Sequence, residues 1–155
     1  MTTLTTGDAA PAFALTDQHG ETVRLEDHRG RMVLVYFYPK ADTPGCTTQS
    51  CELRDHRQEL EALDVDVIGI SPDEPAAQLA FDEKFGLGFP LLADTDHAVA
   101  EAWGTWGERS MYGNTYMGII RSSFLVDGDG RIAEAWYKVR PADTVPKALK
   151  ALAAG

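Results

Sequence analysis

The chain has 155 residues, of which 44% are hydrophobic and 25% are charged, a composition typical of one compact globular domain. Fourteen Lys and Arg stand against 24 Asp and Glu, and the formal net charge of −10 disfavours binding to nucleic acids and anionic membrane surfaces. No segment approaches the ~18 uninterrupted apolar residues of a membrane span, and the N-terminus lacks the basic and apolar pattern of a secretion signal. We therefore expect one cytoplasmic domain over residues 1–155.

The first predicted elements are strands. Short segments at 13–16 and 22–25 flank the turn sequence DQHG and predict an N-terminal β-hairpin. The continuous apolar run MVLVYFY at 32–38 predicts a central strand that is buried on both faces. The elements expected after it are a helix over about 44–63, a strand over 65–71, a helix over about 75–85, a short strand over 90–93, a short helix over 96–103, a hairpin of 123–126 and 132–137 around DGDG, and a helix from 144 to about 152.

Strands and helices alternate in the middle of the chain, and this alternation predicts parallel crossovers. We expect an α/β fold in which helices flank a central mixed β-sheet, similar to that of thioredoxin. The Gly-broken stretch WGTWGERSMYGNTYMG at 103–118 is interpreted as irregular. Its four aromatic residues are expected to pack against the core rather than to line an entrance or a partner surface; they are Trp103, Trp106, Tyr112 and Tyr116.

Both cysteines lie in the segment PKADTPGCTTQSC at 39–51, and two cysteines are too few for a secreted disulfide framework. Thr43 followed by Pro44 is typical of a helix start, with a capping hydroxyl before the proline. Cys46 then lies near the third helical position, where free N–H groups and the helix dipole favour an anion such as a thiolate. We therefore predict that Cys46 is a nucleophile, with a small buried apolar residue as the alternative.

Cys51 follows five positions after Cys46. In an ideal helix this spacing separates the two Cα atoms by roughly 8 to 9 Å, whereas disulfides rarely span more than ~7 Å. The pair should remain two thiols while the helix is wound, and a bond between them requires unwinding. The alternatives are a static disulfide in a segment that is not helical, and a metal site that includes His56. The metal site is disfavoured, because structural zinc normally takes four ligands.

A motif in this segment resembles that of a known family. Pro39, Thr43 and Cys46 form P-x-x-x-T-x-x-C, which is similar to the active-site motif of the peroxiredoxins, thiol peroxidases with a thioredoxin-like fold. The string YFYPKADTPGCTTQSCELRD resembles the subfamily called bacterioferritin comigratory protein, or peroxiredoxin Q. The similarity covers nearly the whole chain, from GDAAPAFAL through DVIGISPD, FPLLAD and WGER to RSSFLVDGDG.

The resemblance implies roles for both cysteines. Cys46 would be the peroxidatic cysteine, whose thiolate attacks hydrogen peroxide or an organic hydroperoxide and becomes a sulfenic acid, with no metal or organic cofactor. Cys51 would be the resolving cysteine, which forms a disulfide with Cys46 after the helix partly unwinds. A thioredoxin or a glutaredoxin-type protein would then reduce this disulfide. Members of the subfamily are often monomers, so a monomer is expected and a dimer is the alternative.

The resemblance also implies a binding site around the peroxide. Arg121 would supply positive charge, Thr43 a hydroxyl, and Pro39 would shield the pocket from water. Gln49 would hold the Arg121 guanidinium through its amide oxygen. Each residue also has a more ordinary alternative role. Arg121 could be an exposed surface arginine and Thr43 only a helix cap. Pro39 could simply end the strand, and Gln49 could face solvent.

Two other classes of function compete with a peroxidase. A thioredoxin-like disulfide exchange protein normally carries Cys-x-x-Cys, whereas four residues separate the cysteines here. A noncatalytic redox sensor or chaperone would react with peroxide once and then stop. The spacing and the predicted anion site favour the peroxidase.

Overall fold

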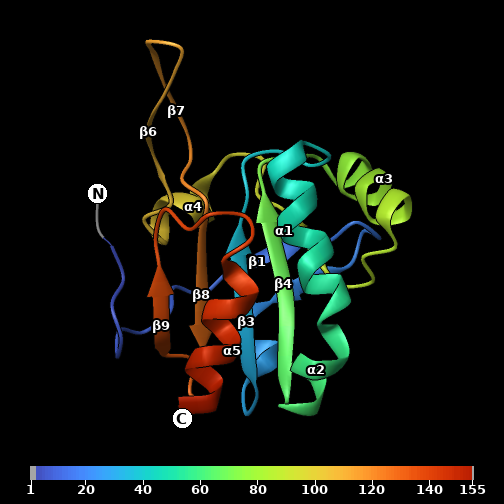
Figure 1. Ribbon diagram of the computed structural model, residues 1–155, viewed down its shortest axis with the longest axis vertical. Coiled ribbons are helices and arrows are strands. Elements are labelled where there is room, and N and C mark those ends of the chain that lie inside the picture. Colours follow the sequence, from blue (N-terminus) through green and yellow to red (C-terminus); the bar gives the residue numbers. More distant parts are fainter. Residues whose placement is uncertain (1–2, 155) are drawn as a thin grey trace.

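The computed structural model describes residues 3–154, which form a central β-sheet with helices on both faces (Figure 1). The sheet has seven strands in the order β2-β1-β5-β4-β3-β8-β9. The elements in chain order are β1 (Ala14–Thr16), β2 (Thr22–Arg24), η1 (Leu25–His28), β3 (Met32–Phe37), α1 (Pro44–Asp55), α2 (Arg57–Ala62), β4 (Val65–Ser71), α3 (Pro75–Phe85), β5 (Leu91–Ala93), α4 (Ala98–Ala102), β6 (Trp106–Met111), β7 (Asn114–Ile119), β8 (Ser122–Val126), β9 (Ile132–Trp136) and α5 (Thr144–Ala154).

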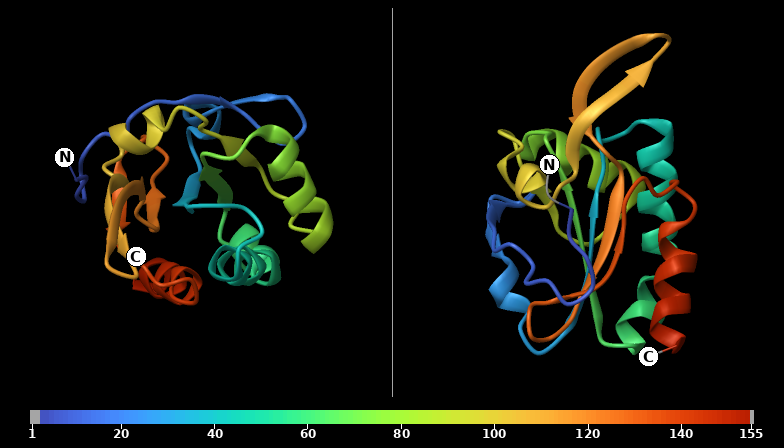
Figure 2. Two further views of the ribbon diagram at one scale, coloured as in Figure 1. Left: turned by 90° about the horizontal axis from the view of Figure 1, so that it is seen from above. Right: turned by 90° about the vertical axis from the view of Figure 1, so that its left-hand side faces the viewer.

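The predicted mixed α/β architecture is confirmed. Strand β3 pairs in parallel with β4 and antiparallel with β8, and β4 pairs in parallel with β5. Side chains alternate between the two faces of β3, so Leu34 and Tyr36 pack with α1, α2, α3 and α5, whereas Val35 and Phe37 pack toward α4 and the N-terminal segment. Figure 2 shows α1 beside α5 on one face of the sheet, with the N-terminal segment on the other.

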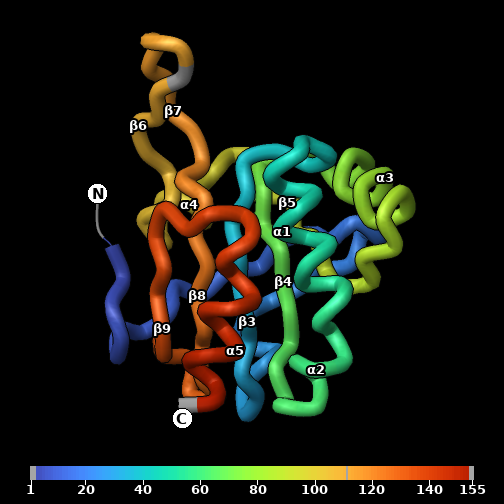
Figure 3. The backbone as a smooth tube through the Cα atoms, in the orientation of Figure 1, coloured from blue at the N-terminus to red at the C-terminus, as the bar shows by residue number. Residues whose placement is uncertain are grey.

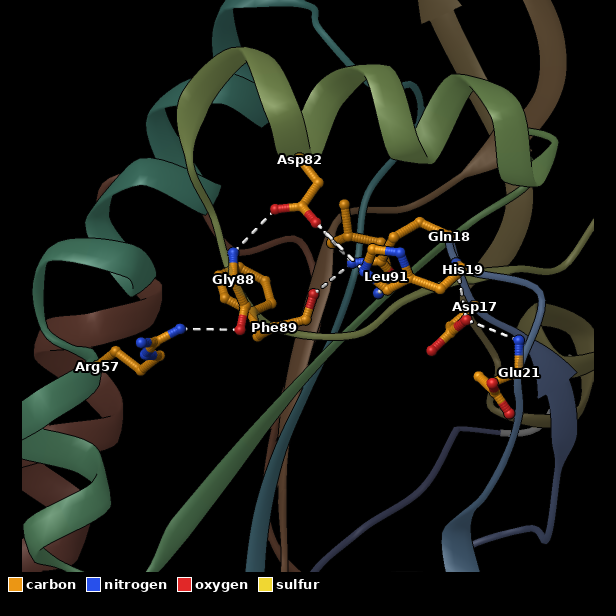
Figure 4. Close-up of polar contacts among 9 residues, drawn as sticks. All are labelled: Asp17, Gln18, His19, Glu21, Arg57, Asp82, Gly88, Phe89 and Leu91. Atoms are coloured by element: carbon orange, nitrogen blue, oxygen red, sulfur yellow. Dashed lines mark hydrogen bonds and ion pairs between the residues drawn. The ribbon is translucent and has the colours of Figure 1, made fainter.

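The turn of the N-terminal hairpin is held by a buried glutamine. Gln18 donates to the carbonyl oxygen of Phe89 over 2.9 Å and accepts from the amide N–H of Leu91 over 2.8 Å. Arg57 at the start of α2 donates to the carbonyl oxygen of Gly88 over 2.8 Å. Together these bonds fasten the loop before β5 from two sides (Figure 4).

The single helix expected over 44–63 is wrong, because the chain forms two helices with a break at His56. The Nδ1 atom of His56 lies 2.9 Å from the carbonyl oxygen of Glu52, which also accepts the His56 backbone N–H over 3.1 Å. Figure 3 shows the path of the chain from β3 over the upper edge of the sheet into α1 and then α2. The short helix η1 was also not predicted, and it takes Leu25 from the expected second strand.

The interpretation of residues 103–118 as irregular is wrong for most of the stretch. Strands β6 and β7 form a separate two-stranded sheet, which projects beyond the end of the main sheet (Figure 2). Tyr112 and Gly113 form its turn, with φ values of 52° and 81°. Trp103 is fully buried and packs against Phe37 and Phe124, as expected for a core residue.

The other aromatic residues of this stretch behave differently from one another. Trp106 is half-buried and stacks on His97, with ring centroids 3.8 Å apart. Tyr112 and Tyr116 are exposed, so the expectation that they pack against the core is wrong. The remaining predicted elements agree with the structure to within about two residues at their ends, a normal margin for helix boundaries.

Within residues 3–154, no helix combines the length and the apolar character that a bilayer crossing requires.

Candidate active site

Cys46 lies at the carboxyl end of the parallel strands, in the first turn of α1. The chain leaves β3 at Phe37, and Pro44 takes the first helical position, so that Cys46 is the third residue of the helix, as predicted. Its side chain is fully buried. The thiol is therefore enclosed at the point where the helix dipole favours an anion.

Thr43 does not cap α1 through its hydroxyl, so that prediction is wrong. The Thr43 hydroxyl instead donates to the carbonyl oxygen of Lys40 over 2.8 Å, and this bond closes the loop between β3 and α1. The same loop is held by Asp73, whose carboxylate accepts from the Ala41 N–H over 2.7 Å. Pro39 lies half-buried at the start of the loop. The loop that precedes Cys46 is thus tied down at both ends.

Arg121 contacts the Cys46 sulfur. One guanidinium nitrogen, Nη2, lies 3.3 Å from Sγ of Cys46. The carbonyl oxygen of Arg121 accepts from the Val139 N–H over 3.0 Å, which fixes the backbone just before β8. A guanidinium remains protonated in proteins, so this contact places a permanent positive charge against the buried sulfur.

Gln49 connects Arg121 to a buried polar chain. Arg121 Nη1 donates to the Gln49 amide oxygen over 2.8 Å, and the amide nitrogen donates to the Thr144 hydroxyl over 2.9 Å. The Thr144 hydroxyl in turn lies 2.9 Å from the Ser123 hydroxyl. Arginine only donates, so the amide oxygen must face Arg121 and the amide nitrogen must face Thr144. Thr144 then accepts from Gln49, and either hydroxyl of the Thr144–Ser123 pair can donate to the other.

The structure brings three of the predicted site residues into direct contact: Cys46, Gln49 and Arg121. Thr43 and Pro39 lie in the adjoining loop, and the Thr43 hydroxyl donates its hydrogen bond to the carbonyl oxygen of Lys40 and not to the Cys46 sulfur. Sequence reasoning missed Thr144 and Ser123, because a contact across 95 residues leaves no local signal. It expected Thr144 only as a helix start.

Gly45 is a further residue that sequence reasoning missed. A Cβ atom at this position would lie 3.0 Å from Nη2 of Arg121 and 3.3 Å from Cγ of Pro141. Both distances are shorter than ordinary van der Waals contact. The glycine therefore allows the first turn of α1 to approach the guanidinium closely. A glycine beside the motif residue Cys46 was the available signal.

Cys46 and Cys51 are both free thiols in a wound helix, which is the reduced arrangement expected from their spacing. Cys51 is only half-buried. The alternative of a static disulfide in a non-helical segment is wrong, because the segment is helical and both thiols are free. Across residues 3–154, no three His, Cys, Asp or Glu side chains gather into a group that could hold a metal ion.

Besides the bonds of Gln49, two further hydrogen bonds hold α1 to the rest of the protein. The hydroxyls of Tyr36 and Ser50 lie 2.8 Å apart in the core, and Arg54 donates to the carbonyl oxygen of Phe85 over 2.6 Å. Burial raises the pKa of Tyr36 well above its usual value, although the hydrogen bond with Ser50 lowers it, so the Tyr36 hydroxyl stays neutral. Any unwinding of α1 past Cys51 has to break these contacts.

Comparison with known proteins identifies the family. The sequence profile of the AhpC/TSA family matches residues 6–135. The chain belongs to the AhpC/TSA family. It is 57% identical over 132 residues to Peroxiredoxin Bcp of Escherichia coli, covering 85% of each chain. It is 45% identical over 150 residues to Peroxiredoxin Bcp of Bacillus subtilis, covering 97% of this chain and 96% of that protein.

Solved structures lead to the same subfamily. Peroxiredoxin Q of Xanthomonas campestris superposes with a TM-score of 0.86 at 35% identity, covering 92% of this chain and 90% of that chain. A cysteine mutant of Xylella fastidiosa PrxQ superposes with a TM-score of 0.92 at 30% identity, covering 99% and 98%. The resemblance to Bcp and peroxiredoxin Q and the thioredoxin-like fold are thereby confirmed, and the protein is a peroxiredoxin with thiol peroxidase chemistry.

Proposed function

We propose that this thiol peroxidase reduces hydrogen peroxide and organic hydroperoxides at Cys46, that Cys51 resolves the oxidised intermediate, and that a dithiol protein such as thioredoxin restores the two thiols. The observation that carries the proposal is the contact of 3.3 Å between Arg121 and the buried Cys46 sulfur at the start of α1. A related Xanthomonas campestris protein is described by its alkyl peroxide reduction activity, which supports organic hydroperoxides as substrates.

In the first step, the Cys46 thiolate attacks one peroxide oxygen. An S–O bond forms as the O–O bond breaks, the sulfur loses two electrons, and the departing oxygen takes a proton to leave as water or an alcohol. Arg121 stabilises the charge that spreads over the peroxide oxygens, since preorganised donors act most strongly where charge develops. The Thr43 hydroxyl, once turned from Lys40, and Gln49 through Arg121 complete the substrate site, and Pro39 shields it from water.

In the second step, the Cys51 thiolate attacks the sulfur of the Cys46 sulfenic acid. An S–S bond forms, the S–O bond breaks, and hydroxide takes a proton and leaves as water. The two cysteines are five residues apart in a wound helix, a separation of roughly 8 to 9 Å between Cα atoms, which exceeds the reach of a disulfide. The first turns of α1 must therefore unwind before this bond can form.

In the third step, an external dithiol reduces the disulfide by exchange through a mixed disulfide. We place this cycle in the cytoplasm, where dithiol systems keep thiols reduced. We also assign it to a monomer of one domain, because both cysteines lie in one helix of one chain.

Peptide mapping after oxidation tests the proposal. One equivalent of hydrogen peroxide should convert the wild-type protein to a form with a bond between Cys46 and Cys51, whereas Cys46→Ser should consume no peroxide and keep Cys51 free. Peroxide consumption by the Cys46→Ser variant at the wild-type rate would overturn the assignment of Cys46.

A further inference from the structure

The β6–β7 hairpin displays side chains that the fold itself does not use. Four large hydrophobic side chains are exposed among the described residues, and three of them lie on this hairpin. Tyr112 at the turn is 96% exposed, and Tyr116 and Met117 on β7 are 41% and 56% exposed. Clustered exposed apolar side chains usually mark an interaction site, and this ribbon stands clear of the main sheet (Figure 1).

One face of the hairpin leads directly to the active site. Tyr116 lies opposite Arg109 in the β6–β7 register, so both side chains lie on the same face of the ribbon. Arg109 and Arg121 line one open cavity of about 350 Å³ at the base of the hairpin. Arg121 also contacts the Cys46 sulfur, so one residue of this cavity touches both the base of the hairpin and the peroxidatic thiol.

The charge of this cavity is opposite to that of the whole chain. Its charged lining consists of four cationic residues and one acidic residue, in a chain with a net charge of −10. The five are Glu108, Arg109, Arg121, Lys138 and Arg140. Arg140 also pairs with Asp143 over 2.8 Å, which leaves Arg109 and Lys138 as the main cations for an outside partner. Charge complementarity then selects a partner with an acidic surface.

We propose that this surface, called here the hairpin face (Arg109, Tyr112, Tyr116, Lys138 and Arg140), is the docking site of the dithiol protein that reduces the Cys46–Cys51 disulfide. The inference rests on the proposed function. It assigns to that partner an acidic and partly apolar surface around its reactive thiols. A small patch suits this role, because redox complexes are among the smallest protein interfaces. A permanently bound second copy would instead cover Arg121, which each peroxide has to reach.

Docking here serves a defined exchange. The first thiolate of the partner attacks one sulfur of the Cys46–Cys51 disulfide, forms an intermolecular S–S bond and releases the other cysteine as a thiolate. The second thiolate of the partner then attacks the partner's first sulfur in this mixed disulfide and releases the remaining peroxiredoxin cysteine as a thiolate. The partner loses two electrons and becomes a disulfide, the peroxiredoxin gains two, and protons from water complete the two thiols.

Peroxide turnover with two different reductants tests the docking site. The first is thioredoxin, recycled by its reductase and NADPH, and the second is dithiothreitol, which is too small to use a docking surface. The variants are the double substitution Tyr112→Ser with Tyr116→Ser, and the charge reversals Arg109→Glu and Lys138→Glu made singly. Leu63→Ser is the matched control, since Leu63 is an exposed large hydrophobic residue, 49% exposed, next to α2.

The hairpin variants should raise the KM for thioredoxin about tenfold, as expected when an aromatic or arginine anchor is lost, and should keep the wild-type rate with dithiothreitol. Leu63→Ser should match the wild type with both reductants. Raising the salt concentration should increase the wild-type KM for thioredoxin more than that of Lys138→Glu.

Three outcomes would overturn the inference. The first is an unchanged KM for thioredoxin in all hairpin variants. If sedimentation also showed that these variants abolish a dimer, the hairpin would be a dimer interface instead. The second is an equal loss of turnover with both reductants, which would assign the hairpin to the peroxide site. The third is a wild-type protein that consumes no peroxide with either reductant, and this result alone would overturn the proposed function as well.

Discussion

Gln49 donates a buried hydrogen bond to Thr144 over 2.9 Å. This bond orients the Gln49 amide so that its oxygen faces Arg121, which in turn contacts the Cys46 sulfur. Thr144 is therefore a positioning residue, because it acts on the thiol through two other side chains. It lies on α5, whereas Gln49 lies on α1, so the same bond also joins the two helices.

Thr144→Val tests this role. The substitution keeps the shape of the side chain but removes the acceptor, and leaving the buried amide nitrogen of Gln49 unsatisfied costs roughly 1 to 3 kcal/mol. The rate of peroxide attack, measured by stopped-flow tryptophan fluorescence, should fall about tenfold as Arg121 loses its fixed orientation. Thr144→Ser retains the hydroxyl and should restore the rate. If Thr144→Val only lowered the free energy of unfolding, with an unchanged rate of attack, the bond would be purely structural.

Gly45→Ala tests whether the position of Arg121 affects the rate of peroxide attack independently of the stability of the fold. The added Cβ would lie 3.0 Å from Nη2 of Arg121, whose flexible side chain can move away, and 3.3 Å from Cγ of Pro141, which has to shift by only a few tenths of an ångström. We expect a melting temperature close to that of the wild type and a rate of peroxide attack lower by about ten- to hundredfold. Thr48→Ala, at an exposed position of the same helix, is the control and should change neither quantity.

Cys51→Ser should stop the cycle halfway. The variant should consume one equivalent of peroxide per chain, because Cys46 still reacts, and then lose turnover supported by thioredoxin, because no disulfide can form. Peroxide consumption is measured in single- and multiple-turnover experiments. Full turnover of this variant with thioredoxin would contradict the role of Cys51 as the resolving residue.

Tyr36→Phe should accelerate the formation of the disulfide. It removes the hydrogen bond of 2.8 Å to Ser50 that holds the middle of α1, and a bond worth about 1 kcal/mol corresponds to about a fivefold change in the opening of the helix. The second, unimolecular phase of the fluorescence trace reports this step, and the first phase should stay unchanged. Tyr38→Phe is the matched control, because the buried hydroxyl of Tyr38 bonds to Gln78 on α3 instead.

Asp66 should make stability depend on pH in the acid range. Burial alone would raise the pKa of this carboxyl, but hydrogen bonds from Arg31 and His28 outweigh burial, so its pKa is lowered in the folded protein. The stabilisation is complete above the unfolded pKa of about 3.9 and is lost as the pH falls through the lower folded value.

Urea unfolding from about pH 7 to pH 2 measures this effect. The difference in unfolding free energy between the wild type and Asp66→Asn should be constant at neutral pH and should shrink below about pH 4. Asp64→Asn, in which the replaced side chain is 85% exposed, should follow the wild-type curve. A difference between wild type and Asp66→Asn that grows as the pH falls would show that the sign is wrong.

The local features of the site could be predicted from the sequence, whereas its long-range contacts could not. The start of α1 at Pro44 and the placement of Cys46 follow from helix-start chemistry that acts within a few residues. Strand β4 was predicted with its observed bounds, Val65–Ser71, because β-branched residues dominate the segment VDVIGIS. The partners of Gln49 are side chains 72 and 95 residues away, and no periodic pattern encodes such pairs.

The β6–β7 hairpin escaped prediction for a different reason. Strand β7 is exposed over its first four residues, so it lacks the alternation of buried and exposed positions from which strands are recognised. Its turn has Tyr112 with a positive φ of 52°, whereas Gly, Asn or Asp normally signal such turns. The break at His56 was missed because the residues on both sides of it favour helix.

The division of the first long helical segment at His56 has a consequence for the whole molecule during turnover. Hydrogen bonds continue across the break, from the His56 N–H to Glu52 and from the Leu60 N–H to His56, so the packing of α2 rather than a gap in the ladder limits how far unwinding spreads. Leu60, on the far side of the break, is fully buried in the core and can keep its packing while the turns around Cys46 open. In the proposed cycle, the segment that melts is then the part of α1 around Cys46 and Cys51, while the packing of α2 keeps the rest of the protein folded.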